Sequence, residues 1–224
     1  MRTLDSLRPL LEEAGAGLEV IVQDGGTAGI EQLQLPSWVN LITGADDGIY
    51  DAMNRGLSRS VGERVWFLNG GDESIVRDWE SLAKMLATAE FIFADYELAF
   101  NGGIRRRRSR PTWYICHALP TSHQAIIYPG DRARDLTYDT SILIAADYDF
   151  TARLIRSGCV PIRSRQSIAR FYVGGASLSS GGAVGRDANR VQREVLHLSS
   201  PIRLLSRGLH SASIAVRRMR AGLR

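Results

Sequence analysis

The sequence predicts an α/β fold built on a mixed, mostly parallel sheet flanked by helices. Two observations lead to it. Short apolar runs alternate with segments in which apolar residues recur at helical spacing, and most of the runs end in glycine- and aspartate-rich turns. In open sheets of this type, ligands bind beyond the carboxyl ends of the strands. The residues that follow the predicted strands are therefore the first candidates for a functional site.

Each predicted element is bounded by turn-forming residues. Leucines recur at helical spacing in residues 4–14, and Gly15 and Gly17 end that helix. Residues 19–23 are a short apolar run ending in an Asp-Gly-Gly turn, which indicates a strand. The same reasoning predicts strands at 38–42, 65–68, 91–94 and 123–128, helices at 49–57, 79–86, 144–157 and within 191–219, a basic loop at 105–110, and a mobile Gly/Ser-rich loop at 174–185.

Basic residues are concentrated near the C-terminal end. Residues 201–224 contain six arginines and no acidic residue, so residues 1–200 carry a charge of −2 within the net charge of +4. This distribution excludes a uniformly basic nucleic-acid-binding domain, and no nucleic-acid partner is expected. Because the arginines alternate with apolar residues, we expect amphipathic helices that bind an anionic membrane surface. A solvated helix face is the alternative.

Length, cysteine content and the N-terminal segment indicate a cytoplasmic protein. The 224 residues suit one domain, or a domain with a tail. No apolar run approaches the ~18–20 residues of a membrane-spanning helix, and the N-terminal segment lacks a signal-peptide core. Cys116 and Cys159 are too few for a disulfide framework, so free, buried thiols are expected. We expect a cytoplasmic protein, peripheral on the inner face of the plasma membrane.

Several carboxylates follow the predicted strands. Asp24 ends the first strand in a glycine turn, where a carboxylate can accept hydrogen bonds from a ligand such as a nucleobase. Asn69 and Asp72 bracket a similar turn and could offer oxygens to Mg²⁺ or Mn²⁺. Asp147 opens a later helix, where a general base could stand. The alternatives are an ordinary turn for Asp24, and a loop residue or helix cap for Asp47, Asp72 and Asp147.

These motifs, in this order, resemble those of a family 2 glycosyltransferase of the GT-A fold. The strings are EVIVQDGG, DDGIYDAMNRGL, FLNGGDE and AADYDF. PTWYICHALPTSHQAIIYP, GGASLS and RVQREVLHL narrow the resemblance to the glycosyltransferases of bacterial colanic acid biosynthesis. The resemblance covers roughly residues 4–200, and its most specific parts are DGIYDAMN and SHQAI.

The resemblance implies an inverting displacement that uses a nucleotide-sugar donor and a divalent cation, Mn²⁺ or Mg²⁺. Asp147 matches the position of the catalytic base, and Asp72 the last acidic position of the metal-binding element. The implied donor-binding residues are Asp24, Gly25, Asp47, Asn54, Asn69 and Asp72. The implied contacts to an acceptor or a phosphate are His123, Gln124 and Arg108, for which a structural histidine and a solvated basic loop are the alternatives.

The sequence departs from the family in two places. Its metal-binding element keeps one carboxylate, because Asn69 and Gly71 stand beside Asp72. The family's first strand, central in its sheet, is missing here. We expect a GT-A-like domain over residues 1–185 and a basic amphipathic helical extension over 186–224.

The activity expected is sugar transfer to a growing, lipid-linked exopolysaccharide acceptor. A competing enzyme class is a sugar-phosphate nucleotidyltransferase, but the Gly-rich phosphate loop expected near its start is not seen in this sequence. The other alternative is a non-catalytic, truncated glycosyltransferase-like subunit that docks on a membrane or an assembly complex.

Overall fold

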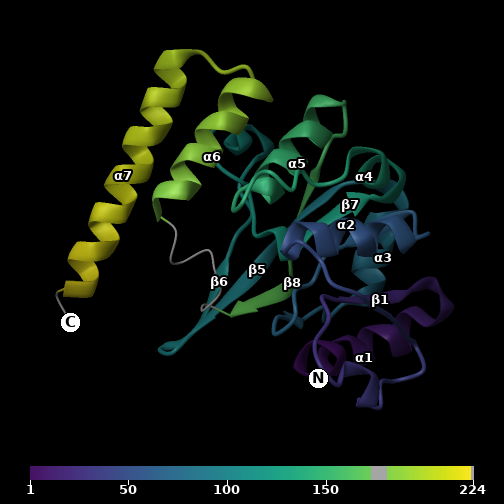
Figure 1. Ribbon diagram of the computed structural model, residues 1–224. Coiled ribbons are helices and arrows are strands. Elements are labelled where there is room, and N and C mark those ends of the chain that lie inside the picture. Colours follow the sequence, from purple (N-terminus) through teal and green to yellow (C-terminus); the bar gives the residue numbers. More distant parts are fainter. Residues whose placement is uncertain (173–180, 223–224) are drawn as a thin grey trace.

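The computed structural model describes residues 1–172 and 181–222, which form two sheets flanked by helices (Figure 1). The smaller sheet pairs β1 (Val20–Asp24) in parallel with β2 (Val39–Thr43). The larger sheet has the order β3-β7-β5-β8-β4, and β6 pairs with β5 outside that path. Its strands are β3 (Arg64–Trp66), β4 (Glu73–Ser74), β5 (Ile92–Phe100), β6 (Gly103–Arg107), β7 (Ile126–Pro129) and β8 (Ile162–Tyr172).

The mixed α/β architecture is confirmed, but parallel pairing is less common than the sequence predicts. Among the described strands, parallel pairs are limited to β1–β2 and β5–β8. The other pairs are antiparallel. No described strand joins β1 to β3, although the Glu19 carboxylate accepts hydrogen bonds from the backbone nitrogens of Val61 and Gly62 at 2.8 and 2.9 Å. The two sheets therefore begin close together without sharing a ladder.

Seven helices are described. They are α1 (Arg2–Ala14), α2 (Ile49–Arg59), α3 (Trp79–Thr88), α4 (Gly130–Leu136), α5 (Ala146–Arg156), α6 (Gly181–Glu194) and α7 (Ser200–Gly222). Local sequence explains several of their ends. Asp78 caps α3, where its carboxylate accepts a hydrogen bond from Ser81 N at 2.8 Å. No helix in the described residues is long and apolar enough to cross a membrane.

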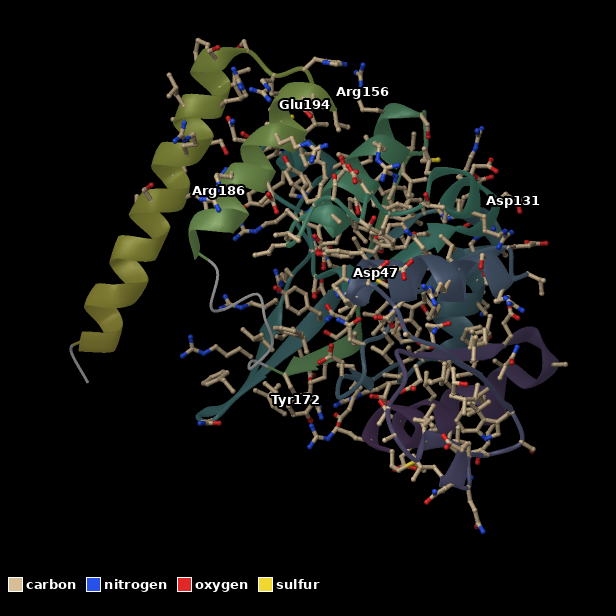
Figure 2. All side chains as sticks on the ribbon, in the orientation of Figure 1. Asp47, Asp131, Arg156, Tyr172, Arg186 and Glu194 are labelled. Carbon is tan, nitrogen blue, oxygen red and sulfur yellow. The ribbon has the colours of Figure 1, made fainter. Side chains whose placement is uncertain are left out.

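The C-terminal helices differ from the prediction. Residues 181–185, expected in a mobile loop, open α6, and the rest of that loop lies outside the described residues. The expected domain boundary at 185/186 thus falls inside α6, in whose second half Val191 and Gln192 are buried. Arg186 and Glu194 mark the two halves of α6 in Figure 2. Since α6 packs against α5 and α7 packs against α6, α7 is the outermost of these three helices (Figure 1).

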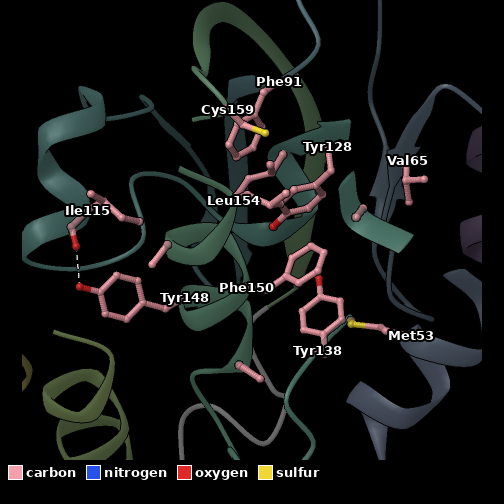
Figure 3. Close-up of a cluster of buried hydrophobic side chains, with 14 of the residues drawn as sticks. Met53, Val65, Phe91, Ile115, Tyr128, Tyr138, Tyr148, Phe150, Leu154 and Cys159 are labelled. Atoms are coloured by element: carbon pink, nitrogen blue, oxygen red, sulfur yellow. Dashed lines mark hydrogen bonds between the residues drawn. The ribbon is translucent and has the colours of Figure 1, made fainter. Parts of the chain in front are cut away.

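The hydrophobic core covers both faces of the larger sheet. Strand side chains alternate between faces, so Phe91 and Phe93 enter one cluster while Ile92 and Ala94 enter the other. The first cluster contains α5 and is rich in aromatic rings (Figure 3). The second cluster lies under α3. Burial on both faces explains why the runs at 91–94 and 125–128 are continuously apolar.

Two predicted segments take another form. The basic loop expected at 105–110 overlaps β6, an edge strand paired with β5 whose five residues are all exposed. The strand expected at 123–128 starts as a single 3-10 turn over His123–Ala125 and becomes extended at Ile126. Cys116 and Cys159 are free thiols, as predicted; Cys159 is buried and Cys116 is half-buried.

Candidate functional site

The candidate site is built at the end of the molecule where β1 and β2 finish. The backbone nitrogen of Gly44, after β2, donates to Asp24 O at the end of β1 at 3.1 Å. The loop after β3 is fastened to the first turn of α1, because Gly71 N donates to Thr3 Oγ1 at 2.9 Å. The structure thus brings the segments after β1 and β2 together at one rim, and it ties the loop after β3 to α1.

Asp24 and Gly25 form the first of these segments. Asp24 Oδ2 accepts hydrogen bonds from the backbone nitrogens of Gly26 and Thr27 at 2.9 and 2.7 Å. Hydrogen bonds from the hydroxyl and the backbone of Thr27 lower the pKa of Asp24, so its carboxyl stays ionised. A Cβ on Gly25 would lie 2.6 Å from Asp46 Oδ2, so the turn packs tightly against the segment before α2.

Asp47 and Asn54 belong to the second segment, and they have different environments. Asp47 is exposed near the start of α2 (Figure 2). The expected carboxylate cap is not formed there, because Gly48 is the N-cap residue and has no side chain. Asn54 does not face the rim: its Oδ1 accepts from Tyr138 N at 2.7 Å and its Nδ2 donates to Tyr138 O at 2.9 Å. With both groups bonded to one residue, Asn54 does not fit the donor-binding role implied by the sequence.

Asp72 is almost buried, with 5% of its surface exposed. Its Oδ2 accepts from Gln124 Nε2 at 2.8 Å and its Oδ1 from Tyr172 N at 3.0 Å. Burial raises the pKa of Asp72, against these hydrogen bonds. Gln124 is itself only 1% exposed. It therefore holds Asp72 in place, and its predicted contact with an acceptor does not fit this geometry.

The described residues around Asp72 offer a divalent cation few ligands. Both Asp72 carboxylate oxygens accept hydrogen bonds inside the protein. Within residues 1–172 and 181–222, no three His, Cys, Asp or Glu side chains are grouped so that they could hold a metal. The Asn69 amide nitrogen instead lies 3.2 Å from His123 Nε2. A cation at Asp72 stays a prediction that only an experiment can test.

His123 is neutral in this environment. Its Nε2 lies 3.2 Å from the Asn69 amide nitrogen, and its buried Nδ1 has no hydrogen-bond partner among the described residues. Burial lowers the pKa of His123 to about 4, so no positive charge is available near neutral pH for a phosphate. Arg108, the other predicted phosphate contact, is exposed just after β6.

Asp147 lies in the first turn of α5 and is half-buried. Burial raises its pKa to about 6, opposed by a hydrogen bond from Tyr148 N to Oδ1 at 2.8 Å. A carboxylate that titrates near 6 can accept a proton at neutral pH and is a stronger base than an exposed aspartate. Asp149 is less suited to this role, because its Oδ2 pairs with Arg153 Nε at 2.7 Å.

Tyr50 connects Asp147 to the rim. It lies one turn after Asp47, and its hydroxyl donates to Ile144 O at 2.6 Å, three residues before Asp147. Sequence reasoning gave no role to Tyr50 or to Tyr138. Tyr50 stands inside the DGIYDAMN string, which is a usable signal. Tyr138 has no motif that could have identified it.

Comparisons with known proteins agree with this architecture. No family model and no curated protein matches the chain. Among solved structures, it is similar to residues 1–349 of S. aureus TarS, a glycosyltransferase, in complex with UDP. That match has a TM-score of 0.60 at 14% identity and covers 87% of this chain and 67% of that one. The fold is GT-A-like.

Two further TarS structures show the same likeness. The complex of TarS 1-349 with UDP-GlcNAc matches with a TM-score of 0.61 at 15% identity, over 87% of this chain and 68% of that one. A longer TarS chain matches with a TM-score of 0.63 at 14% identity, and only 40% of it is covered. The chain thus spans about two thirds of TarS 1-349 and two fifths of the longer chain.

Proposed function

We propose that the protein is an inverting glycosyltransferase that moves a sugar from a nucleotide-sugar donor to a growing, lipid-linked exopolysaccharide acceptor. The observation that carries the proposal is the half-buried Asp147 carboxylate, with a pKa of about 6, joined through Tyr50 to the rim that holds Asp24 and Asp47. The GT-A-like fold adds support, since TarS was solved with UDP and with UDP-GlcNAc. The sequence motifs favour family 2 and a colanic acid-type acceptor.

In the proposed reaction, Asp147 is the general base. Its carboxylate takes the proton of an acceptor hydroxyl, whose oxygen bonds to C1 of the donor sugar from the opposite face. The C1–O bond to the diphosphate breaks, and its electron pair leaves with the nucleoside diphosphate. One bond forms, one breaks, and the configuration at C1 inverts.

The donor side of the site is assigned to the rim. The ionised Asp24 could accept a hydrogen bond from a nucleobase, and Gly25, which has no side chain, lets this turn pack against Asp46. Asp47 is exposed beside this turn. No step of the proposed transfer depends on a cation at Asp72.

Donor binding gives the first test. UDP, GDP, dTDP and CDP are titrated by calorimetry, and we expect one of them to bind with a Kd below about 1 mM, the usual range of enzyme affinities. Sugars on that nucleotide are then assayed for transfer to a lipid extract of the source cell's membrane. Binding that fails in EDTA and returns with Mn²⁺ would support the cation predicted at Asp72, and binding kept in EDTA would remove it from the proposal.

If no nucleotide binds with or without Mn²⁺, the protein is better explained as a non-catalytic subunit. This second candidate is favoured by one observation: the Asn54 side chain and both Asp72 carboxylate oxygens are occupied by contacts inside the protein.

The helix α7 is the proposed contact with the membrane. Ser206 faces the protein and bonds to His117 Nδ1 and Gln192 Nε2 at 2.8 and 2.9 Å. Ile202, Leu205 and Leu209 form a stripe at i, i+3 and i+7 that is 48%, 66% and 54% exposed. Residues 201–224 of the sequence contain six arginines and no acidic residue. An apolar stripe with a cationic flank fits the surface of an anionic bilayer, which also holds a lipid-linked acceptor.

Replacing Ile202, Leu205 and Leu209 together by Ser is expected to weaken binding to phosphatidylglycerol-containing vesicles at least 10-fold in co-sedimentation, because the apolar stripe is lost. The matched control replaces three other exposed apolar residues, Leu33, Val61 and Val160, by Ser. Equal losses in both variants would contradict a role specific to α7, and so would a dimer in solution that disappears only in the α7 variant.

A further inference from the structure

The segment before the proposed base, residues 137–145, has no regular structure but is bonded to three helices. We call residues 137–147 the base segment. From α2, Tyr50 bonds to Ile144 O, and Asn54 bonds to both backbone groups of Tyr138. These contacts join residues 84 to 94 positions apart in the sequence. The base segment is thus tied to the DGIYDAMN motif rather than to its sequence neighbours.

Side chains of α5 and α6 also form hydrogen bonds with the base segment. Arg153 of α5 donates to Leu136 O and Thr137 O at 2.8 and 2.7 Å. Thr137 has a φ of 46°, which a β-branched residue rarely adopts, so surrounding bonds must maintain it. Asp187 of α6 accepts from Ile144 N at 3.2 Å. Both backbone groups of Ile144, three residues from Asp147, are therefore bonded to side chains of other helices.

Aromatic packing strengthens the link from α2. The Tyr50 ring stacks on Tyr138 with centroids 5.5 Å apart and an interplanar angle of 21°. Tyr138 in turn stacks on Phe150 at 4.3 Å and 16° (Figure 3). Phe150 lies one helical turn after Asp147, so the stack runs from α2 through the base segment into the helix that carries the base. Burial raises the pKa of Tyr50, as does the Asp147 charge, which keeps the hydroxyl protonated as a donor.

We infer that Tyr50 and Asn54 are positioning residues that hold the base segment in place so that Asp147 faces the acceptor, and that Asn54 does not contact the donor. The assignment of Asp147 as the base rests on the proposed function. The inference that Tyr50 and Asn54 fix the base segment does not depend on the proposed function, because it is defined by contacts within the chain. A backbone displacement of about 1 Å at a reacting group can lower turnover by about 10²-fold.

The first test needs no turnover. In Asn54→Ala the Tyr138 amide loses its acceptor, so hydrogen exchange measured by mass spectrometry should be about 10-fold faster in residues 137–147. Tyr50→Phe should accelerate the same peptides, since it removes the bond to Ile144 and keeps the ring. The matched control is Thr121→Val, which removes a buried hydroxyl bond to Ala94 O far along the chain. Unchanged exchange in both variants would refute the hold on the base segment, whatever the enzyme does.

The second test uses kinetics on the whole protein. Tyr50→Phe is expected to lower kcat at least 10-fold with the KM for the donor within about twofold, and to move the acid limb of the kcat–pH profile, because the surroundings of Asp147 change. Thr121→Val should keep both parameters. A donor KM raised 10-fold in Asn54→Ala with kcat unchanged would show instead that Asn54 binds the donor. An equal fall of kcat in Thr121→Val would show that any loss of stability has the same effect, and would also overturn the inference.

Discussion

Replacing Asp147 by Asn is expected to lower transfer by about 10²–10⁴-fold and to leave nucleotide binding nearly unchanged. Positioned general bases contribute factors of this size, and an amide cannot accept the acceptor's proton. Asn is nearly the same size as Asp, and its Oδ1 can still accept the hydrogen bond from Tyr148 N. Initial rates with the donor found by titration give the first quantity, and calorimetry with the matching nucleoside diphosphate gives the second.

The pH dependence of the wild-type enzyme provides an internal check. Since the pKa of Asp147 is about 6, the fraction of ionised base, and with it kcat, should fall tenfold for each pH unit below 6. An exposed aspartate would keep its activity down to about pH 4. A matched control is Asp149→Asn. The Asp149 carboxylate is paired with Arg153, so its removal should leave the acid limb of the kcat–pH profile unchanged. A limb near pH 4, or wild-type turnover in Asp147→Asn, would contradict the assignment.

Asp147→Asn should also change the free energy of unfolding, which can be measured without a substrate. A carboxyl whose pKa is raised on folding favours the folded state when protonated, and this contribution is lost as the pH rises through about 6. A rise of about two pKa units corresponds to about 2–3 kcal/mol. Asp147→Asn should therefore be more stable than the wild type at pH 7.5, and the difference should shrink by pH 4.5. No difference at either pH would mean that the carboxyl is not buried.

Much of the fold could be predicted because local signals agreed with it. β1 is a short apolar run followed by a turn, and α2 shows a clear apolar face with Met53 and Leu57 buried. The run at 91–94 begins β5, but the strand continues past the expected end to Phe100. β8 was missed because its side chains include Arg, Ser and Gln; neighbouring elements bury it, as the 2% exposure of Ser164 shows. β6 was missed for the opposite reason, since its five residues are all exposed and give no alternation of burial.

The positions of three candidate residues in the fold could be predicted, because turn and helix-start signals mark the ends of strands and helices. Asp24 ends β1, Asp47 lies just before α2, and Asp147 lies in the first turn of α5. The roles of Asn54 and Gln124 could not be predicted, because their partners Tyr138 and Asp72 lie 84 and 52 positions away. A polar side chain inside a motif that resembles a glycosyltransferase motif suggests ligand binding, whereas burial with satisfied hydrogen bonds is known only from the structure.

Phe150→Ala is expected to lower the free energy of unfolding by about 3–5 kcal/mol, the usual cost of removing a buried aromatic ring. Phe150 has no exposed surface, and its ring contacts those of Tyr128 at 5.2 Å, Tyr138 at 4.3 Å and Phe67 at 6.5 Å (Figure 3). Urea denaturation followed by tryptophan fluorescence and circular dichroism measures the change. The m-value should stay constant if the denatured state is unaffected.

The matched control is Trp113→Ala, which also removes a large aromatic ring. Trp113 is 71% exposed and meets only the edge of Tyr114 at 6.1 Å, so its loss should cost less than about 0.5 kcal/mol. Phe150→Leu keeps most of the volume and should fall between the two. Because Phe150 supports both α5 and Tyr138, a cost as small as that of Trp113→Ala would mean that this aromatic cluster does not hold α5 against the sheet. The placement of Asp147 beside the rim would then lose its physical basis.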